Sequence, residues 1–524
     1  MAGGVGTWAR EHVWEIPLRR YLSLLLAAAL VAGGVFGVRT LMHDDRRCAP
    51  GVSRPAGSDE CVGVASGVYD FGQPRFHQVV EAIGRENKGL RSGSYVTVAL
   101  MLPFTSTSVT NLNDIEHQLQ GAYLAQYAAN HDSNGQSPQI RLVLANSGTG
   151  EDSWRPTVDQ LAGMTRSADR LRAVAGIGQS TDPNQAAVAA LTRLGIPVIG
   201  SSITADELAN GQRGKKPDPY PGLARVAPTN TDEARALASY TKAKANRTNE
   251  NKAMLVYDKP GDPYTNSLKQ SFTTLMNGSP YQPVLEQPFT PPADRSQEGT
   301  TANTFRQITN IVCDTPRDTH TILFAGRHTQ LRQFVNALGD RGCMDRSFQV
   351  LTGDEASYLT YEKELNRDAL RHNLTVLFTS LAHPDAWLKN PPKTGGSTAD
   401  YETLQRLLKT AEHKPAGPIG PVALDDGQLI IGYDALQLAV HGIREAVPEG
   451  RSIPTLADVG LQWPQVKGSL KVAGASGWIC LDEHGNPYDK AVPIVRLTPE
   501  GDSQFVQLAW PEGKPPGKDC LPPA

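Results

Sequence analysis

AVAGIGQSTDPNQAAVAALTRLGIPVIG, residues 173–200, is the stretch that decides the fold. Its uncharged opening run predicts a buried strand over 173–178, and the IPVIGSS run predicts another over 196–202. Between them Asp182 is a good N-cap, Pro183 suits the first helical turn, and Gly195 suits the helix end. Strand, helix and strand in this order predict a parallel β-α-β unit.

The same alternation extends in both directions from this unit. Helical spacing of apolar residues recurs at 112–130 and 157–171, and YDKPGDPYTN repeats the helix start with Asp262 as the cap. Because the pattern restarts and 524 residues exceed one ordinary core, we expect two α/β lobes with parallel sheets. The expected strands are 95–102, 140–146, 173–178, 196–202, 253–258, 321–326, 348–354 and 374–380.

The two ends of the chain depart from this alternation. Residues 39–93 are polar, with scattered Gly, Pro and Arg and one short helix expected near 76–83, which predicts a stalk. A helix is expected over 432–440, and the runs after it read as adjacent strands without helices between them. Such a strand cluster suits a hinge and the edge of the second lobe.

Residues 21–38, YLSLLLAAALVAGGVFGV, carry no charge and follow Arg19 and Arg20. At about 1.5 Å per residue, a helix of this length only just crosses a hydrocarbon core of roughly 30 Å. No small-x-small cleavage pattern follows, so we expect an uncleaved membrane anchor, with a cleavable signal peptide as the alternative. Arginines flank both ends, so the positive-inside rule does not orient the segment.

All six cysteines follow this apolar segment, and none is in a CxxC pair. An even number with long spacings fits disulfides in an oxidising compartment, and buried free thiols are the alternative. Disulfides would place the chain after residue 40 outside the membrane, on the extracytoplasmic side. We expect local pairs, although the sequence allows other connectivities: Cys48–Cys61, Cys313–Cys343 and Cys480–Cys520.

The charge balance and the motifs argue against several classes of function. With 51 basic and 54 acidic side chains the formal charge is -3, which gives no general attraction for nucleic acid or anionic lipid. The 12 histidines are dispersed, and HExxH, GxSxG and GxxxxGK[ST] are absent from the sequence. We therefore expect no catalytic residues, no metal site and no cofactor.

Several segments resemble type 1 periplasmic-binding proteins, especially the branched-chain-amino-acid-type substrate-binding proteins of ABC importers. AGIGQSTDPNQAAVAALTRLGIPVIGSSIT (175–204) resembles the family's Gly-x-x-Ser turn, helix and following strand. LVYDKPGDPYTNSLKQSF (255–272) is similar to its strand, acidic turn and Tyr-containing helix start. Further similar pieces are ILFAGRHTQLRQFVNAL (322–338), GYDALQLAV (432–440) and GASGWICLDEHGNPYDKAVPIVRL (474–497). The pieces follow the family's order over about residues 94–510.

The resemblance implies an α/β, two-lobed type 1 fold: two doubly wound parallel sheets joined by a three-strand hinge, here with an N-terminal transmembrane helix. In that family the chain crosses between the lobes three times. The expected division is a cytoplasmic N-terminus (1–20), the anchor (21–38), the stalk (39–93), lobe 1 (94–226 and 354–450), lobe 2 (227–353, then 451–510 with the hinge) and a tail (511–524).

The predicted site in lobe 1 consists of hydroxyl side chains that follow two strands. In open α/β sheets, ligands bind beyond the carboxyl ends of the strands, where helix N-termini present unpaired N–H groups. Ser180 and Thr181 precede a helix there and can hold a carboxylate, or they can be plain helix caps. Ser201, Ser202 and Thr204 follow the next strand and can line the same wall, or form a solvated turn.

The predicted site in lobe 2 combines an aromatic ring with acids. By resemblance, Tyr264 is the aromatic that covers the ligand, although a ring packed on its own lobe is the alternative. Asp354 or Glu355 can bind a ligand ammonium group, with Arg327 nearby, although Glu355 also suits a capping or hinge role. The family's own amine-binding acid has no clear counterpart in 287–301. After the first strand, this chain departs from the family with a hydroxyl-rich stretch that includes Thr105, Ser106 and Ser108.

The resemblance implies binding of a small polar solute, an amino acid or a relative, for delivery to an ABC permease. A membrane-anchored sensing ectodomain that acts through a signalling partner is the alternative, and a ligand-free scaffold is a third hypothesis because fold alone does not prove function. In each case we expect a single-pass protein of the cell membrane with its main domain extracytoplasmic.

Overall fold

The computed structural model describes residues 46–523, with gaps at 133–135, 212–216, 245–250, 278–280 and 293–297, together with Pro17, Tyr21, Leu25 and Leu26. The chain divides into two compact units, 1–49 and 50–524. In the first unit, strand β1 spans Arg47–Ala49. The expected anchor over 21–38 lies outside the described residues, apart from three isolated positions. Within the part of the chain that is described, no helix is long and apolar enough to cross a membrane.

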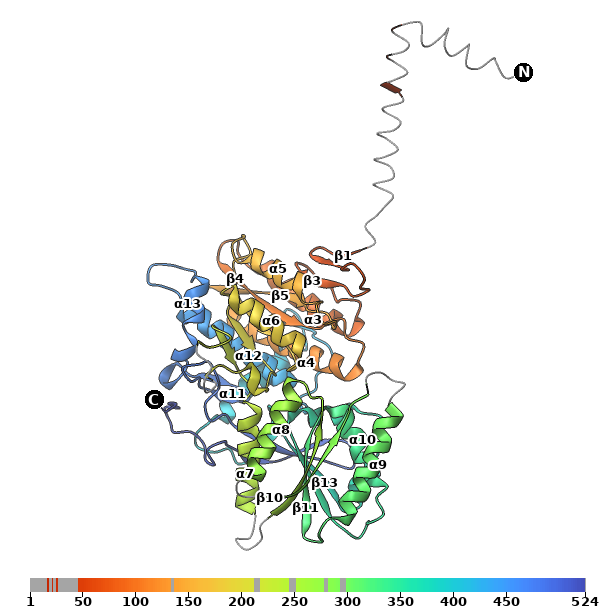
Figure 1. Ribbon diagram of the computed structural model, residues 1–524. Helices are drawn as coiled ribbons and strands as arrows, with labels where there is room; N and C mark the ends of the chain where they lie inside the picture. Colours follow the sequence, from red (N-terminus) through yellow and green to blue (C-terminus); the bar gives the residue numbers. More distant parts are fainter. Residues whose placement is uncertain are drawn as a thin grey trace, which may run out of the picture. The chain divides into compact units, whose positions relative to one another are not determined.

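The second unit contains two lobes, each built on one sheet (Figure 1). In lobe 1 the strands lie in the order β2-β3-β5-β4-β6-β7-β8, in which β4 to β8 are parallel and β2 and β3 are antiparallel. Its strands are β2 (Val52–Ser53), β3 (Val62–Ala65), β4 (Tyr95–Leu102), β5 (Gln139–Asn146), β6 (Leu171–Gly176), β7 (Val198–Gly200) and β8 (Leu223–Arg225). Its helices are α3 (His77–Gly89), α4 (Val109–His131), α5 (Arg155–Met164), α6 (Asp182–Arg193), α11 (Thr398–Thr410), α12 (Gln428–Glu445) and α13 (Leu456–Gly460).

Lobe 2 repeats the plan of lobe 1 with strands in the order β10-β9-β11-β12-β13-β16-β17. The strands β9 to β13 are parallel, and β16 and β17 extend the sheet in antiparallel pairs. Its strands are β9 (Asn251–Asp258), β10 (Tyr281–Phe289), β11 (Thr319–Ala325), β12 (Phe348–Thr352), β13 (Leu374–Thr379), β16 (Val492–Leu497) and β17 (Ser503–Ala509). Its helices are α7 (Asn230–Lys244), α8 (Pro263–Met276), α9 (Glu298–Asp314), α10 (His328–Gly339) and the 3-10 helix η5 (Asp354–Tyr361).

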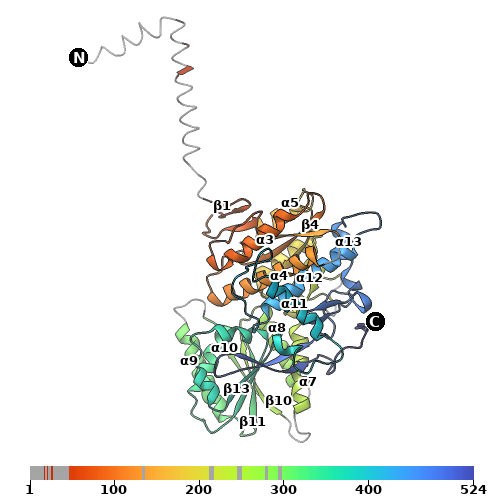
Figure 2. The ribbon, with the colours of Figure 1, turned by 180° about the vertical axis from the view of Figure 1, so that it is seen from behind.

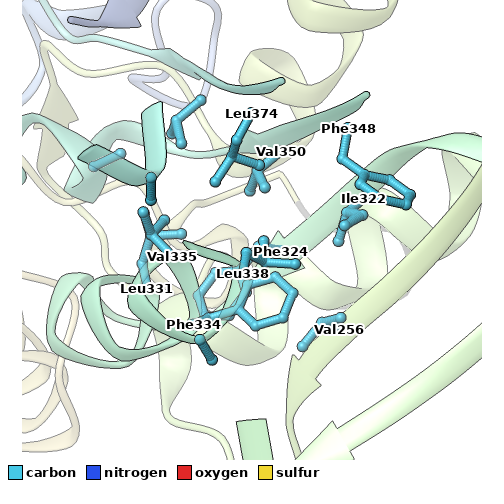
Figure 3. Packing of buried hydrophobic residues seen from close by; sticks show 14 of the residues in the cluster. Val256, Ile322, Phe324, Leu331, Phe334, Val335, Leu338, Phe348, Val350 and Leu374 are labelled. Atoms are coloured by element: carbon cyan, nitrogen blue, oxygen red, sulfur yellow. The ribbon is translucent and has the colours of Figure 1, made fainter. Parts of the chain in front are cut away.

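The sheet of lobe 2 is buried on both faces, which explains why its strands are almost continuous apolar runs. Met254 and Val256 of β9 join Phe334 and other residues of α9 and α10 in one core, part of which Figure 3 shows. Leu255, between them, points to the other face and packs with residues of α7 and α8. The pairs α7–α8 and α9–α10 therefore cover opposite faces of the sheet (Figure 2).

In both lobes the five parallel strands have the spatial order 2-1-3-4-5. In this arrangement the helices that follow the first and third strands lie on opposite faces, which opens a crevice beyond the carboxyl ends of these strands. The crevice of lobe 1 lies beyond β4 and β6, and that of lobe 2 lies beyond β9 and β11. We call these two places the switch points.

The chain crosses between the lobes three times, but some of the crossings lie at positions other than those expected. The first crossing, 227–229, lies between β8 of lobe 1 and α7 of lobe 2. The second is 380–397 and not 353–354, because β13 still pairs with β12 in lobe 2. The third is 480–491, after the hairpin β14 (Val472–Gly474) and β15 (Gly477–Ile479). These crossings, all described, contain no β-strand, so the expected three-strand hinge is wrong.

The expected stalk over 39–93 is also wrong for most of its length. Strand β3 pairs with β5 in the sheet of lobe 1, and helix α3 buries Val79, Val80 and Ile83. The expected tail over 511–524 is fixed as well, because Cys520 is disulfide-bonded to Cys480. Residues 50–93 and 511–523 are therefore parts of the second compact unit.

The disulfides agree with the expected local pairing. Cys313 is bonded to Cys343 and Cys480 to Cys520, and Cys48 and Cys61 are disulfide-bonded as well. All six cysteines are described and none is free. The alternative of buried free thiols is thus contradicted.

Helices α4 and α12 cross in lobe 1 at two glycines, Gly121 and Gly432. A Cβ on Gly121 would lie 2.0 Å from Leu429 O and 2.6 Å from Tyr433 N, which are backbone atoms that cannot rotate away. We expect Gly121→Ala to lower the free energy of unfolding by about 1–3 kcal/mol or more, measured by urea denaturation.

The matched control is Gly163→Ala in helix α5, where a new Cβ would meet nothing within 4 Å. Its stability should stay unchanged or rise by up to about 1 kcal/mol. Equal stability of the two variants would contradict the close α4–α12 packing.

Candidate ligand-binding site

A cavity of about 140 Å³ lies at the switch point of lobe 1. It is formed by the loops after β4, β5 and β6 and by the first turns of α4 and α6. Its polar and charged lining residues are Ser106, Asn111, Asp114, Thr149, Gln179, Thr181 and Asn184. Cavities for drug-sized ligands begin at roughly 300 Å³, so this one suits a smaller solute.

Asp114 of α4 is the only charged residue in this lining. Its side chain is 4% exposed and accepts hydrogen bonds from Gln118 Nε2 at 2.6 Å and from the Tyr358 hydroxyl at 3.1 Å. Burial raises the pKa of Asp114 to about 7; the charge of Asp426 adds to the shift, and the hydrogen bonds and His117 oppose it. Because Tyr358 belongs to η5 of lobe 2, Asp114 also lies where the two lobes meet.

The hydroxyls of two predicted residues, Ser201 and Ser202, belong to the hydrogen-bond network of Gln118 and Asp114 and do not face the cavity. Ser201 Oγ lies 2.6 Å from Gln118 Oε1 and 2.9 Å from Gly176 O, and its one proton can be donated to either acceptor. Ser202 Oγ donates to Gly178 O at 3.2 Å and accepts from Gln118 Nε2. Gln118 is fully buried, so these serines position Gln118 behind Asp114.

Ser180 and Thr204 lie together at the lobe interface. Ser180 Oγ accepts from the backbone amides of Thr204 at 3.0 Å and Ala205 at 3.1 Å. Thr204 Oγ1 donates to Asp354 Oδ1 of lobe 2 at 3.5 Å. The hydroxyl oxygen of Ser180 therefore stabilises a turn of lobe 1, and the Thr204 hydroxyl forms a hydrogen bond to lobe 2.

The start of helix α6 is not arranged to bind a carboxylate. Thr181, and not Asp182, is the N-cap, and its hydroxyl accepts from Asn184 N at 3.4 Å. Asp182 instead places a negative charge in the first turn, and Pro183 has no N–H to donate. Thr181 lines the cavity, but its helix start favours no anion there.

At the switch point of lobe 2, Arg327 joins several predicted residues. It follows β11, donates to Asp262 Oδ2 from Nε at 2.8 Å and forms a short ion pair with Glu355. Its Nη2 donates to Ser180 O of lobe 1 at 2.6 Å, and its guanidinium carbon lies 4.7 Å from the centre of the Tyr264 ring. Ser180 and Tyr264 thus face each other through one guanidinium.

The three predicted residues of lobe 2 are used within this cluster. Tyr264 is 2% exposed, and its hydroxyl accepts from Glu355 N at 3.4 Å. Burial alone would raise the pKa of Glu355, but Arg327 and His328 lower it to about 2. Burial and the adjacent Glu355 raise the pKa of Asp354 to about 7, against the pull of Arg327. Glu355 is therefore held as a charged ion-pair partner, whereas Asp354 favours its neutral form.

Asp354 has a second acidic neighbour, Glu233 of helix α7. Glu233 is 1% exposed and accepts a short hydrogen bond from the Thr379 hydroxyl. Its pKa is raised, first by burial and then by the charge of Asp354. Two buried carboxyls this close resist simultaneous ionisation.

The hydroxyl-rich stretch after β4 has mixed roles. Ser106 lines the cavity, whereas Ser108 caps α4 by accepting from Asn111 N at 3.4 Å. Thr105 donates to Glu60 at 3.4 Å. The same Glu60 carboxylate accepts from Thr149 N at 3.0 Å and so holds one wall of the cavity.

Sequence reasoning missed Asp114 and Gln118 because the segment 112–130 was interpreted only as a helix that packs on a sheet. The available signal was a dense run of polar residues in the first half of this segment: Asp114, Glu116, His117, Gln118 and Gln120. All five are buried, which is unusual for polar residues on every side of one helix. Glu60 was missed because its segment was assigned to the stalk.

Comparison with solved structures shows the same fold. A leucine-binding protein of Thermotoga maritima has 16% identity and a TM-score of 0.54, over 80% of this chain and 100% of that one. A branched-chain amino acid transporter substrate-binding protein of Streptococcus pneumoniae, in complex with isoleucine, has 14% identity and a TM-score of 0.52, over 79% and 99%.

A third similar structure is an ABC transporter solute-binding protein of Rhodopseudomonas palustris, in complex with 3,4-dihydroxybenzoic acid. Its identity is 15% and its TM-score 0.53, over 79% of this chain and 97% of that one. No protein-family model and no curated protein sequence matches the chain. The chain thus has the two-lobed α/β fold of type 1 periplasmic-binding proteins.

Proposed function

We propose that the chain binds a small polar solute outside the cytoplasm and delivers it to an ABC importer. The observation that carries this proposal is the polar cavity at the switch point of lobe 1, beside the lobe interface. The solved proteins with this fold that are named above bind leucine-type or aromatic solutes. The disulfides Cys313–Cys343 and Cys480–Cys520 support an oxidising compartment. The proposal includes a membrane anchor over residues 21–38, which we call the tether.

The chemistry of the described residues favours binding over catalysis. The acids and hydroxyls at the lobe interface bind one another or backbone groups, which positions the lobes. The proposed role of Ser180, Thr181, Ser201, Ser202, Thr204, Tyr264, Asp354 and Glu355 is to shape and close the site around the solute. We assign direct contact with the solute to the side chains that line the cavity.

A ligand screen with the full-length chain in mild detergent tests the proposal. We expect one class of small metabolite to raise the melting temperature by several degrees, because a saturating ligand stabilises the folded state by about 3 kcal/mol at 100 times Kd. Mass spectrometry of small molecules that co-purify with the chain should identify the same class. No stabilisation across a broad panel of amino acids, amines, organic acids and sugars would overturn the proposal.

Sensing through a partner protein is a second candidate function, and the contacts of Glu60 favour it. Glu60 lies between β2 and β3, near the start of lobe 1, and accepts a hydrogen bond from the backbone N–H of Thr149 in the cavity lining. Occupancy of the cavity can therefore alter the segment that follows the tether. Neighbouring permease and ATPase genes would support transport, whereas a neighbouring kinase gene would support sensing.

A further inference from the structure

The cavity lining contains an acidic side chain and no basic side chain. Asp114 is the only ionisable carboxyl in that lining, and no Lys, Arg or His is part of it. The nearby arginines are already engaged: Arg75 pairs with Glu116 at 2.8 Å, and Arg327 pairs with Asp262 at 2.7 Å and with Glu355. A solute in the cavity thus meets a carboxyl without a basic side chain beside it.

The lining also offers an acceptor without a donor. Asn111 Oδ1 is buried and has no hydrogen-bond partner among the described residues. Asn111 and Asp114 lie three residues apart on α4, which places them on the same side of the helix. An ammonium group carries three donors and no acceptor, so it fits a carboxylate and an amide oxygen.

The cavity offers a carboxylate no charged partner. One buried side-chain donor of the lining, Gln179 Nε2, has no hydrogen-bond partner among the described residues, but it is neutral and no basic side chain stands beside it. Further donors would have to come from the start of α6. There Thr181 is used as a cap, Asp182 adds negative charge and Pro183 lacks an N–H. An α-amino acid would therefore gain binding free energy at its ammonium group and lose binding free energy at its carboxylate.

We infer that the solute is a small organic cation without a carboxylate, whose ammonium group binds between Asp114 and Asn111. The inference rests on the proposed function and names the class of solute for the same cavity. It differs from the solutes of the similar structures, which are a neutral amino acid and an aromatic acid.

Proton release accompanies the binding of such a cation. With a pKa of about 7, Asp114 is partly protonated at neutral pH and must ionise to pair with an ammonium group. The titratable groups that face it are Asp426 before α12, His117 on its own helix and Tyr358 of η5. His117 is paired with Asp426 at 2.6 Å, so a proton on Asp114 is the one that the ligand displaces.

The experiment is isothermal titration of the full-length chain with charged and uncharged isosteres. The probes are putrescine against 1,4-butanediol, ethanolamine against ethylene glycol, and L-leucine, L-isoleucine and succinate. We expect an amine to bind, with an affinity that rises with pH between about 5 and 7, and with protons released in buffers of different ionisation enthalpy. Asp114→Asn should weaken this binding by about 10- to 100-fold.

The matched control is Asp159→Asn, which removes an exposed carboxylate from α5 of the same lobe and should leave the affinity unchanged. Proton release by the unmodified chain supports the inference even if Asp114→Asn folds poorly. Binding of L-leucine or succinate in preference to the amines would overturn the inference but leave the proposed function standing. Binding of no probe, together with an unsuccessful wider screen, would overturn both.

Discussion

Arg327→Met is expected to lower the free energy of unfolding by about 3–5 kcal/mol, because it leaves Glu355 and Asp262 without their cation. Glu355 is 3% exposed, so water cannot replace the guanidinium at that carboxylate. The change also removes the hydrogen bond from Arg327 to Ser180 O, which links the two lobes. Urea denaturation measures the loss of stability, and small-angle scattering measures whether the lobes separate.

The matched control for this variant is Arg235→Met. The Arg235 side chain is 56% exposed and lies 3.7 Å from Asp232, so its removal should cost at most about 1 kcal/mol. The double variant Arg327→Met/Glu355→Gln should recover part of the loss, because the charge left unpaired is removed as well. If Arg327→Met were as stable as Arg235→Met, the guanidinium would not hold the lobes as described.

Asp354→Asn is expected to flatten the pH dependence of stability. The pKa of Asp354 is raised to about 7 from an unfolded value near 4, so the folded state binds this proton more tightly than the unfolded chain. Its contribution to stability is therefore complete below about pH 4 and is lost as the pH rises through 7. Glu355, with a pKa lowered to about 2, behaves in the opposite way: its contribution is complete above about pH 4.5 and is lost toward pH 2.

Urea denaturation between about pH 4.5 and 7.5 separates these contributions. The unmodified chain should lose stability across this range through Asp354, whereas Glu355 is already fully ionised there. The difference between the unmodified chain and Asp354→Asn should change by on the order of a few kcal/mol. Parallel curves for the two proteins would show that Asp354 is not the group that titrates.

The sequence predicts the sheets well where strands are buried on both faces. Such strands are nearly continuous apolar runs, and the expected strands 95–102 and 374–380 match β4 and β13 within one residue. Strand β10 was missed because it contains Pro283 and Pro288, which are tolerated only because β10 is an edge strand of its sheet. Helix α5 ends at Met164, earlier than the expected 171, because turns separate it from β6.

Assignment of the strands to lobes was harder to predict than the strands themselves. No feature of the local sequence distinguishes β13, which belongs to lobe 2, from a strand that returns to lobe 1. The stalk was misread for a related reason: β3 is only Val62–Ala65, and its place is set by pairing with β5, far along the chain. Long-range pairing, and not local pattern, decides both cases.

For the candidate site, the sequence predicts hydroxyls and acids beyond the strand ends but not Asp114, the carboxyl that we assign to the ligand. The predicted hydroxyls lie beyond the expected strands, yet Ser180 and Ser201 bind groups of their own lobe. Asp114 lies on a helix that the sequence pattern marked as packing surface. Its significance depends on Tyr358 of the other lobe, and a contact across two lobes leaves no local signature.

A crystal structure of the chain with the tightest-binding solute of the screen tests the central claim most directly. The account predicts electron density for the solute at the switch point of lobe 1, with a nitrogen within hydrogen-bond distance of the Asp114 carboxylate. Density for the solute elsewhere, with Asp114 still bonded only to Gln118 and Tyr358, would contradict it.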